Sequence, residues 1–284
     1  MAQTPTTLIV GDAQVRVRTV GEGAPVLMIA SLGRDVSDFD QLAEDLAAQG
    51  FMAILPSPRG GADELASRGP AAQTIADLAD DAAGVIDQLC DGPAHVVGHA
   101  FGQRVTRMLA ARHPGRVRSV VLLAAGGRAA MPENVRQDLI MSVSVNSFPM
   151  PDHRAAIARA FFAQGQDASV WHDGWFPLTA QMQVQAVQRT PLSDWWAGGS
   201  APMLVVQAAE DPIAPAANGE ALLAEFPDRV RLVSLAHASH AILPEQPAAV
   251  AAVVAAFLSG ERDQAALQRL IDRNVRIPQQ AEAG

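Results

Sequence analysis

The stretch GHAFG at residues 98–102 comes nearest to a catalytic motif in this sequence. The apolar run AHVV precedes it and the helix-like segment QRVTRMLA follows it, which predicts a strand, a tight turn and a helix. A G-x-S-x-G nucleophile elbow has this layout, with an attacking serine at the middle position. Here the middle position is Ala100, whose methyl group is no nucleophile. The motif therefore predicts a turn without its reactive side chain.

Two further residues with acid–base chemistry follow apolar runs later in the chain. Asp211 lies in QAAEDPIAP at 207–215, and His240 lies in AHASHAILPEQP at 236–247. Each has a structural alternative, because an aspartate before a helix often serves as its N-cap and a lone histidine often packs in a core. His237 is interpreted as a structural residue on a strand face, and His99 as a packing residue of the turn.

The composition excludes several classes of function. The 284 residues carry a formal net charge of -9, which argues against a nucleic-acid partner, since such proteins present a basic face. All 21 basic residues are arginine, so lysine Schiff-base chemistry and a Gly-Lys phosphate loop are excluded. The single cysteine, Cys90, forms neither an internal disulfide nor a multi-cysteine zinc site, and is interpreted as a packing residue.

The ends and the apolar runs of the sequence carry no targeting signal. The N-terminal residues lack a basic segment followed by a long apolar one, so no secretory signal is expected. No uncharged apolar run reaches the roughly 18 residues of a membrane span. These observations predict a cytoplasmic protein without a membrane partner.

Strand-like and helix-like segments alternate along most of the chain. The alternation predicts an α/β fold whose central sheet is mostly parallel and covered by helices on both faces. Between 127 and 200 the pattern changes to short helices and includes all four tryptophans. This segment is interpreted as a helical lid inserted into a core of 1–126 and 201–284. Whether the lid or the tail after Gly260 forms a homodimer contact is left open.

These motifs together resemble the α/β-hydrolase superfamily over nearly the whole chain. The resemblance rests on GHAFG, QAAEDPIAP and AHASHAILPEQP, in which nucleophile, acid and histidine follow in the chain order of that family. It implies an α/β-hydrolase fold and places the three roles at Ala100, Asp211 and His240. The segments SLGR, PRG and GHAFG are similar to those of a bacterial subgroup with alanine at the nucleophile position, which favours a native alanine.

The resemblance also implies an oxyanion hole made of two backbone N–H groups. Phe101 follows the nucleophile position and would supply the first donor. Leu32, in the loop after VLMIA, would supply the second, although the family usually has His-Gly where this chain has Ala30 and Ser31. Ser31 is interpreted as a substrate-binding residue.

The tryptophans and the charges near the oxyanion loop have less specific interpretations. Trp171 and Trp175 are expected to line an apolar pocket for a small-molecule substrate, although tryptophans of a lid more often form its core. Arg34 and Asp35 are interpreted as a surface ion pair. No ligand cluster or dinucleotide motif is present, so neither a metal nor an organic cofactor is expected.

Three explanations of Ala100 follow. It is an engineered change that traps a substrate, or a native residue beside a His240–Asp211 base that works alone, or the mark of a non-catalytic binding protein. The function favoured is hydrolysis of a small apolar ester or lactone. The alternatives are cofactor-independent proton transfer or carbon–carbon chemistry by the same pair, and ligand binding by a pseudoenzyme.

Overall fold

One sheet of eight strands runs through the computed structural model, which describes residues 5–59, 74–144 and 149–277. The strand order is β1-β2-β4-β3-β5-β6-β7-β8. β1 and β2 form an antiparallel hairpin, β2 is antiparallel to β4, and all pairs from β4 to β8 are parallel. The strands are Thr6–Val10 (β1), Ala13–Val20 (β2), Ala24–Ile29 (β3), Phe51–Pro56 (β4), Ala94–His99 (β5), Val117–Leu123 (β6), Met203–Ala208 (β7) and Val230–Leu235 (β8).

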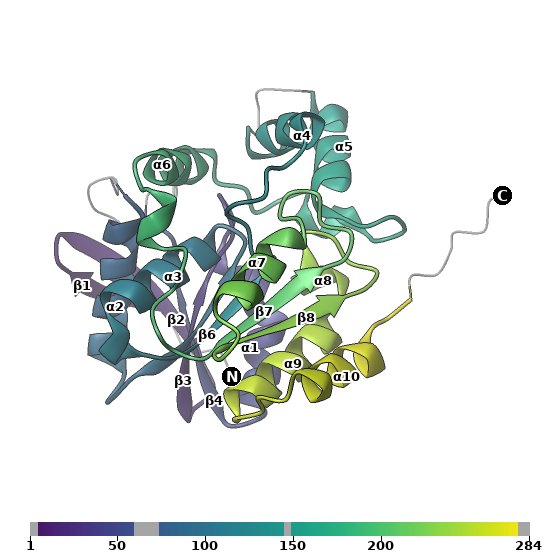
Figure 1. Cartoon of the computed structure of the whole chain (residues 1–284). Helices are drawn as coiled ribbons and strands as arrows, with labels where there is room; N and C mark the ends of the chain where they lie inside the picture. Colours follow the sequence, from purple (N-terminus) through teal and green to yellow (C-terminus); the bar gives the residue numbers. More distant parts are fainter. Residues whose placement is uncertain (1–4, 60–73, 145–148, 278–284) are drawn as a thin grey trace.

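Helices cover both faces of this sheet (Figure 1). One face carries α1, α9 and α10, and the other carries α2, α3 and α7. The described α-helices are Asp40–Ala47 (α1), Ile75–Leu89 (α2), Gly102–Arg112 (α3), Glu133–Val143 (α4), Met150–Phe161 (α5), Pro177–Gln188 (α6), Ala217–Glu225 (α7), Ile242–Glu245 (α8), Pro247–Leu258 (α9) and Gln264–Asn274 (α10). None of them is long and apolar enough to cross a membrane.

The continuous apolar runs form the inner strands because both faces of those strands are buried. In β3, Val26 and Met28 belong to the hydrophobic core under α9, whereas Leu27 between them belongs to the core under α2 and α3. Every residue of β5 and of β7 is buried. This is the pattern expected for parallel strands between two helical layers. The predicted mostly parallel α/β fold is confirmed.

A helical segment joins β6 to β7 and contains α4, α5 and α6. Figure 1 shows these three helices along one side of the molecule, beyond the layers that cover the sheet. Trp195 and Trp196, which were expected in the lid, instead lie in the hydrophobic core shared by α2, α3 and α7. The end of the 127–200 segment is therefore part of the main body.

Candidate active site

Ala100 occupies the turn between β5 and α3 with a φ of +50°, in the left-handed region. Such a φ is uncommon for a residue with a side chain, and it persists only where the surrounding structure imposes it. The flanking glycines supply that constraint. A Cβ at Gly98 would overlap the Thr106 hydroxyl, and a Cβ at Gly102 would overlap the carbonyl oxygen of Ile29. Helix α3 thus packs too closely on β3 and β5 for any other residue at the two glycine positions.

His240 and Asp211 form a buried hydrogen-bonded pair beside this turn. The distance from His240 Nδ1 to Asp211 Oδ2 is 2.8 Å, and the residues are 4% and 6% exposed. Asp211 follows β7 and His240 follows β8, so the carboxyl ends of neighbouring parallel strands bring them together. When Nδ1–H donates to the carboxylate, Nε2 keeps its lone pair and can accept a proton.

The second carboxylate oxygen of Asp211 has a separate role. Oδ1 accepts hydrogen bonds from the N–H groups of Ile213 at 2.9 Å and Ala214 at 2.8 Å. The residue therefore stabilises the turn that follows it, as its capping alternative predicted, and it also orients His240. The two roles use different oxygen atoms, so they do not compete.

The backbone of His240 is fixed by a second histidine. His99 Nε2 lies 2.8 Å from the carbonyl oxygen of His240, and burial lowers the pKa of His99 to about 3. The neutral ring donates its Nε2–H to that carbonyl, because a carbonyl only accepts. His237, expected on a strand face, lies in the turn after β8 with a φ of +53°, so that expectation was wrong. Its carbonyl accepts a hydrogen bond from Gln166 at 2.7 Å.

Glu245 adds a third constraint on the histidine loop. Its carboxylate accepts the N–H of Ser239 at 2.8 Å and the N–H of Ala163 at 2.6 Å. It thereby connects the loop that carries His240 to the residues that follow α5 in the inserted segment. Burial raises the pKa of Glu245 to about 7, against the effect of the two N–H donors. The segment PEQP was noted in the sequence, but this residue was not singled out.

The raised pKa of Glu245 makes stability depend on pH. Between about pH 4.5 and pH 7 the unfolded chain releases a proton that the folded chain retains. We therefore expect the free energy of unfolding to fall across this window, by up to about 3 kcal/mol, and then to level off. The Glu245→Gln variant should lack this part of the fall in denaturant unfolding at pH 5 and pH 8.

Other buried carboxylates also titrate. The informative quantity is therefore the difference between the variant and the unaltered protein in how far the free energy of unfolding falls from pH 5 to pH 8. Glu44→Gln, at an exposed position of α1, is the matched control and should keep the full fall. An equal fall in the Glu245→Gln variant and in the unaltered protein would contradict the raised pKa of Glu245.

Two backbone N–H groups beside the turn are free to bind an anion. Phe101 immediately precedes α3, whose N-terminal end carries partial positive charge, and Leu32 lies in the loop after β3. Within the described part of the chain, neither N–H donates an internal hydrogen bond, whereas the next N–H, of Gly33, donates to Gln183 at 2.8 Å. Both predicted oxyanion donors are thus available.

A cavity of about 240 Å³ connects these groups. Ser31, Leu32, Ala100, Phe101 and His240 all line it. The rest of its wall is mainly apolar, and α3 adds Gln103 and Arg104 to it. Its apolar side chains come from the inserted segment and from the loop after β7, namely Met131, Leu139, Phe161, Val184, Val187, Ile213 and Ala214. Five sequence-predicted residues therefore meet at one cavity, with Asp211 directly behind His240.

The two tryptophans expected to line the pocket are not in its wall. Trp171 and Trp175 pack on Arg34, whose guanidinium carbon lies 4.6 Å and 4.7 Å from their rings. Arg34 is buried and forms its ion pair with Asp38 at 2.7 Å, so the expected surface pair with Asp35 was wrong. Asp35 instead caps the short helix that follows it. This cluster connects the oxyanion loop to the inserted segment.

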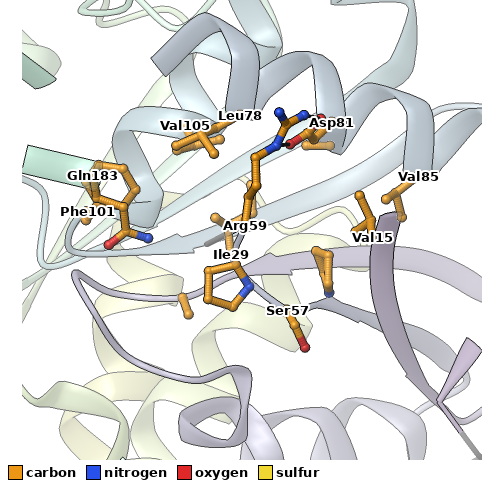
Figure 2. A pocket seen from close by; sticks show the side chains of 14 residues that line it. Val15, Ile29, Ser57, Arg59, Leu78, Asp81, Val85, Phe101, Val105 and Gln183 are labelled. Atoms are coloured by element: carbon orange, nitrogen blue, oxygen red, sulfur yellow. Dashed lines mark hydrogen bonds and ion pairs between the residues drawn. The ribbon is translucent and has the colours of Figure 1, made fainter. Parts of the chain in front are cut away.

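Phe101 also lines a second, smaller hollow (Figure 2). Its volume is about 60 Å³, and its charged groups satisfy each other, since Arg59 Nε donates to Asp81 at 2.8 Å. Neither His240 nor Ala100 reaches it. The larger cavity is therefore the candidate active site.

Comparison with known proteins agrees with this geometry. A model described as the alpha/beta hydrolase fold matches residues 24–149, and one described as TAP-like protein matches residues 168–267. The chain belongs to the α/β-hydrolase superfamily. Among solved α/β-hydrolase folds, an enol-lactonase from Burkholderia xenovorans LB400 aligns at a TM-score of 0.75 and 23% identity, covering 89% of this chain and 100% of that one. A hydrolase from Pseudomonas aeruginosa PA01 has the same TM-score and identity over 90% and 98% of the two chains.

Curated relatives match over shorter segments. A pimeloyl-[acyl-carrier protein] methyl ester esterase from Chromobacterium violaceum is 32% identical over 117 residues, which is 41% of this chain and 43% of that protein. The alignments with the first three such relatives cover 43% to 46% of their lengths. These partial matches support the superfamily.

Proposed function

We propose that this α/β-hydrolase-fold protein hydrolyses a small, mainly apolar ester or lactone. The observation that carries the proposal is the buried His240–Asp211 pair, which opens onto the same cavity as the turn at Ala100 and the free N–H groups. The relatives named as an esterase and an enol-lactonase act on the same kind of bond, which supports this choice of substrate.

Water supplies the attacking oxygen in the proposed reaction, because Ala100 has none. His240 Nε2 takes a proton from a water molecule, and the resulting hydroxide forms a bond to the carbonyl carbon. The carbonyl oxygen gains negative charge and is stabilised by the N–H groups of Phe101 and Leu32. The bond to the leaving oxygen then breaks, and the imidazolium returns the proton to it. The products are one carboxylic acid and one alcohol, or one hydroxy acid from a lactone.

Two further assignments belong to this proposal. Ser31 lines the cavity next to the Leu32 donor and would hydrogen-bond the substrate through its hydroxyl. Helices α4 to α6 would act as the lid, since Met131, Leu139 and Val184 contribute to the cavity wall. The connections of Glu245 and Arg34 would hold this lid against the catalytic loops.

A second candidate function is proton abstraction next to a substrate carbonyl. It is favoured by one observation, namely that the His240–Asp211 pair is complete although the nucleophile position carries only a methyl group. The same N–H groups would then stabilise an enolate. Exchange of substrate α-hydrogens for deuterium, without ester cleavage, would distinguish this reaction from hydrolysis.

The His240→Ala variant tests the main proposal. Loss of the general base should lower the turnover of short esters and lactones by about a hundredfold or more. The matched control is His237→Asn, which removes a histidine from the same loop with a residue that tolerates positive φ. Turnover should be followed by pH-stat titration of the released acid. No turnover by the unaltered chain, or equal turnover by the His240→Ala variant, would contradict hydrolysis.

A further inference from the structure

The candidate cavity contains one permanent charge among its described lining residues, and that charge is positive. Arg104 lines the cavity, and the only other ionisable side chain in the wall is His240. No carboxylate is among these lining residues. Asp211 lies behind His240 and is occupied by the histidine ring and two N–H groups.

No described residue supplies a hydrogen-bond acceptor to Arg104. Within the described residues its guanidinium makes no hydrogen bond or ion pair, and its one specific contact is with the Trp195 ring at 5.3 Å. Two buried arginines nearby do have partners, since Arg34 pairs with Asp38 and Arg107 donates to Gln103 and to the Gly126 carbonyl. A guanidinium offers five N–H donors, and those of the partly exposed Arg104 stay available to an acceptor in the cavity.

The position of Arg104 is also unfavourable for folding. It is the third residue of α3, and the N-terminal turn of a helix repels positive charge through the helix dipole. Arg107, one turn later, is fully buried without a carboxylate partner, and Arg128 shares the same region with Glu225 as its partner. Burial lowers the pKa of Arg107, and repulsion from Arg104 and Arg128 lowers it further, so Arg104 adds its charge to a region that already holds two other arginines.

We propose that Arg104 binds a carboxylate group of the substrate, so that the substrate is a small ester or lactone that carries a free acid. A carboxylate is planar and matches the fork of a guanidinium, which can donate two parallel hydrogen bonds to it. The apolar wall then contacts the carbon chain between the acid and the reacting carbonyl. The ester or lactone part of this assignment rests on the proposed function, whereas the carboxylate part rests on Arg104 alone.

Binding of two isosteric ketones tests the carboxylate without requiring turnover. 5-Oxohexanoate and 5-oxohexanamide have the same heavy-atom skeleton and differ in charge, and neither contains an ester. By titration calorimetry the unaltered protein should bind the acid about tenfold to a hundredfold more tightly than the amide. In Arg104→Met, which keeps an unbranched aliphatic side chain and removes the guanidinium, the ratio should fall to about one.

The matched control is Arg112→Met, which removes one charge from the exposed end of the same helix. It should keep the full preference for the acid. Thermal unfolding of the Arg104→Met variant should occur no lower than that of the unaltered protein, since a cation is removed from the first turn. A ratio near one in the unaltered protein, an unchanged ratio in the Arg104→Met variant, or no measurable binding of either ketone overturns the proposal.

Turnover of monomethyl and dimethyl glutarate separates this proposal from the proposed reaction. A preference for the oxo acid in binding, without cleavage of either ester, contradicts hydrolysis and leaves the carboxylate site established. Cleavage of both esters at equal efficiency, with no preference for the oxo acid in binding, supports hydrolysis and contradicts the carboxylate site.

Discussion

Replacement of Ala100 by serine is expected to raise the turnover of an activated ester by at least about a thousandfold. In enzymes with a serine–histidine–aspartate unit, loss of the serine costs about six powers of ten in rate. Here the histidine and the aspartate are already paired at 2.8 Å, and the turn already imposes a φ of +50° on residue 100. The substitution would then supply the one group that is missing, the hydroxyl.

The expected gain depends on His240, which a double variant can test. Ala100→Ser combined with His240→Ala should lower the rate to that of the single His240→Ala variant, because serine is a weak nucleophile without a base. Ala129→Ser is the matched control, since it adds a hydroxyl to the same cavity wall away from the turn. Burst kinetics with p-nitrophenyl acetate would measure acylation directly. No gain from the Ala100→Ser change would mean that the turn is not poised for acyl transfer.

Much of the fold could be predicted from the sequence because burial leaves a local signature. Strand β7 begins with the apolar run MLVV, and the structure buries all of its residues between two helical layers. In β2 buried and more exposed residues alternate over part of the strand, as expected of a strand with one buried face, and Val17 of β2 pairs with Thr6 of β1. The strand order could not be predicted in this way. β3 lies between β4 and β5 through contacts between distant segments, which leave no local pattern in the sequence.

The site was predictable to the extent that its chemistry lies in short motifs. Ala100, Asp211 and His240 each lie in one such segment, and a single cavity wall includes Ala100, His240 and the two oxyanion donors. Their supporting contacts join distant segments, as between His99 and His240 or between Glu245 and Ala163. Residue type alone does not identify such partners.

The arginines illustrate the same limit. Arg34 and Asp38 are four residues apart, a spacing that brings side chains together on a helical turn, so their ion pair could have been found by inspection. The lack of a partner for Arg104 could not have been found by inspection, because it depends on every segment that surrounds the cavity. The tryptophans were assigned to the pocket by composition, whereas Arg34 occupies their faces.

The Asp211→Asn change should lower kcat/KM of the Ala100→Ser variant by about 10³ to 10⁴ while leaving the protein folded. The asparagine oxygen can still accept the N–H groups of Ile213 and Ala214, as Oδ1 of the aspartate does. Its NH₂ group then faces His240 Nδ1 and must donate to it, which forces the proton onto Nε2 and removes the base from the cavity.

Glu210→Gln, at the exposed neighbouring position, is the matched control and should change neither kcat/KM nor the melting temperature. A small kinetic effect of the Asp211→Asn change would mean that His240 keeps its tautomer without the aspartate. A large loss of stability would mean that the aspartate acts mainly on the turn. The two oxygens of one carboxylate thus allow orientation of the base and support of the fold to be measured separately.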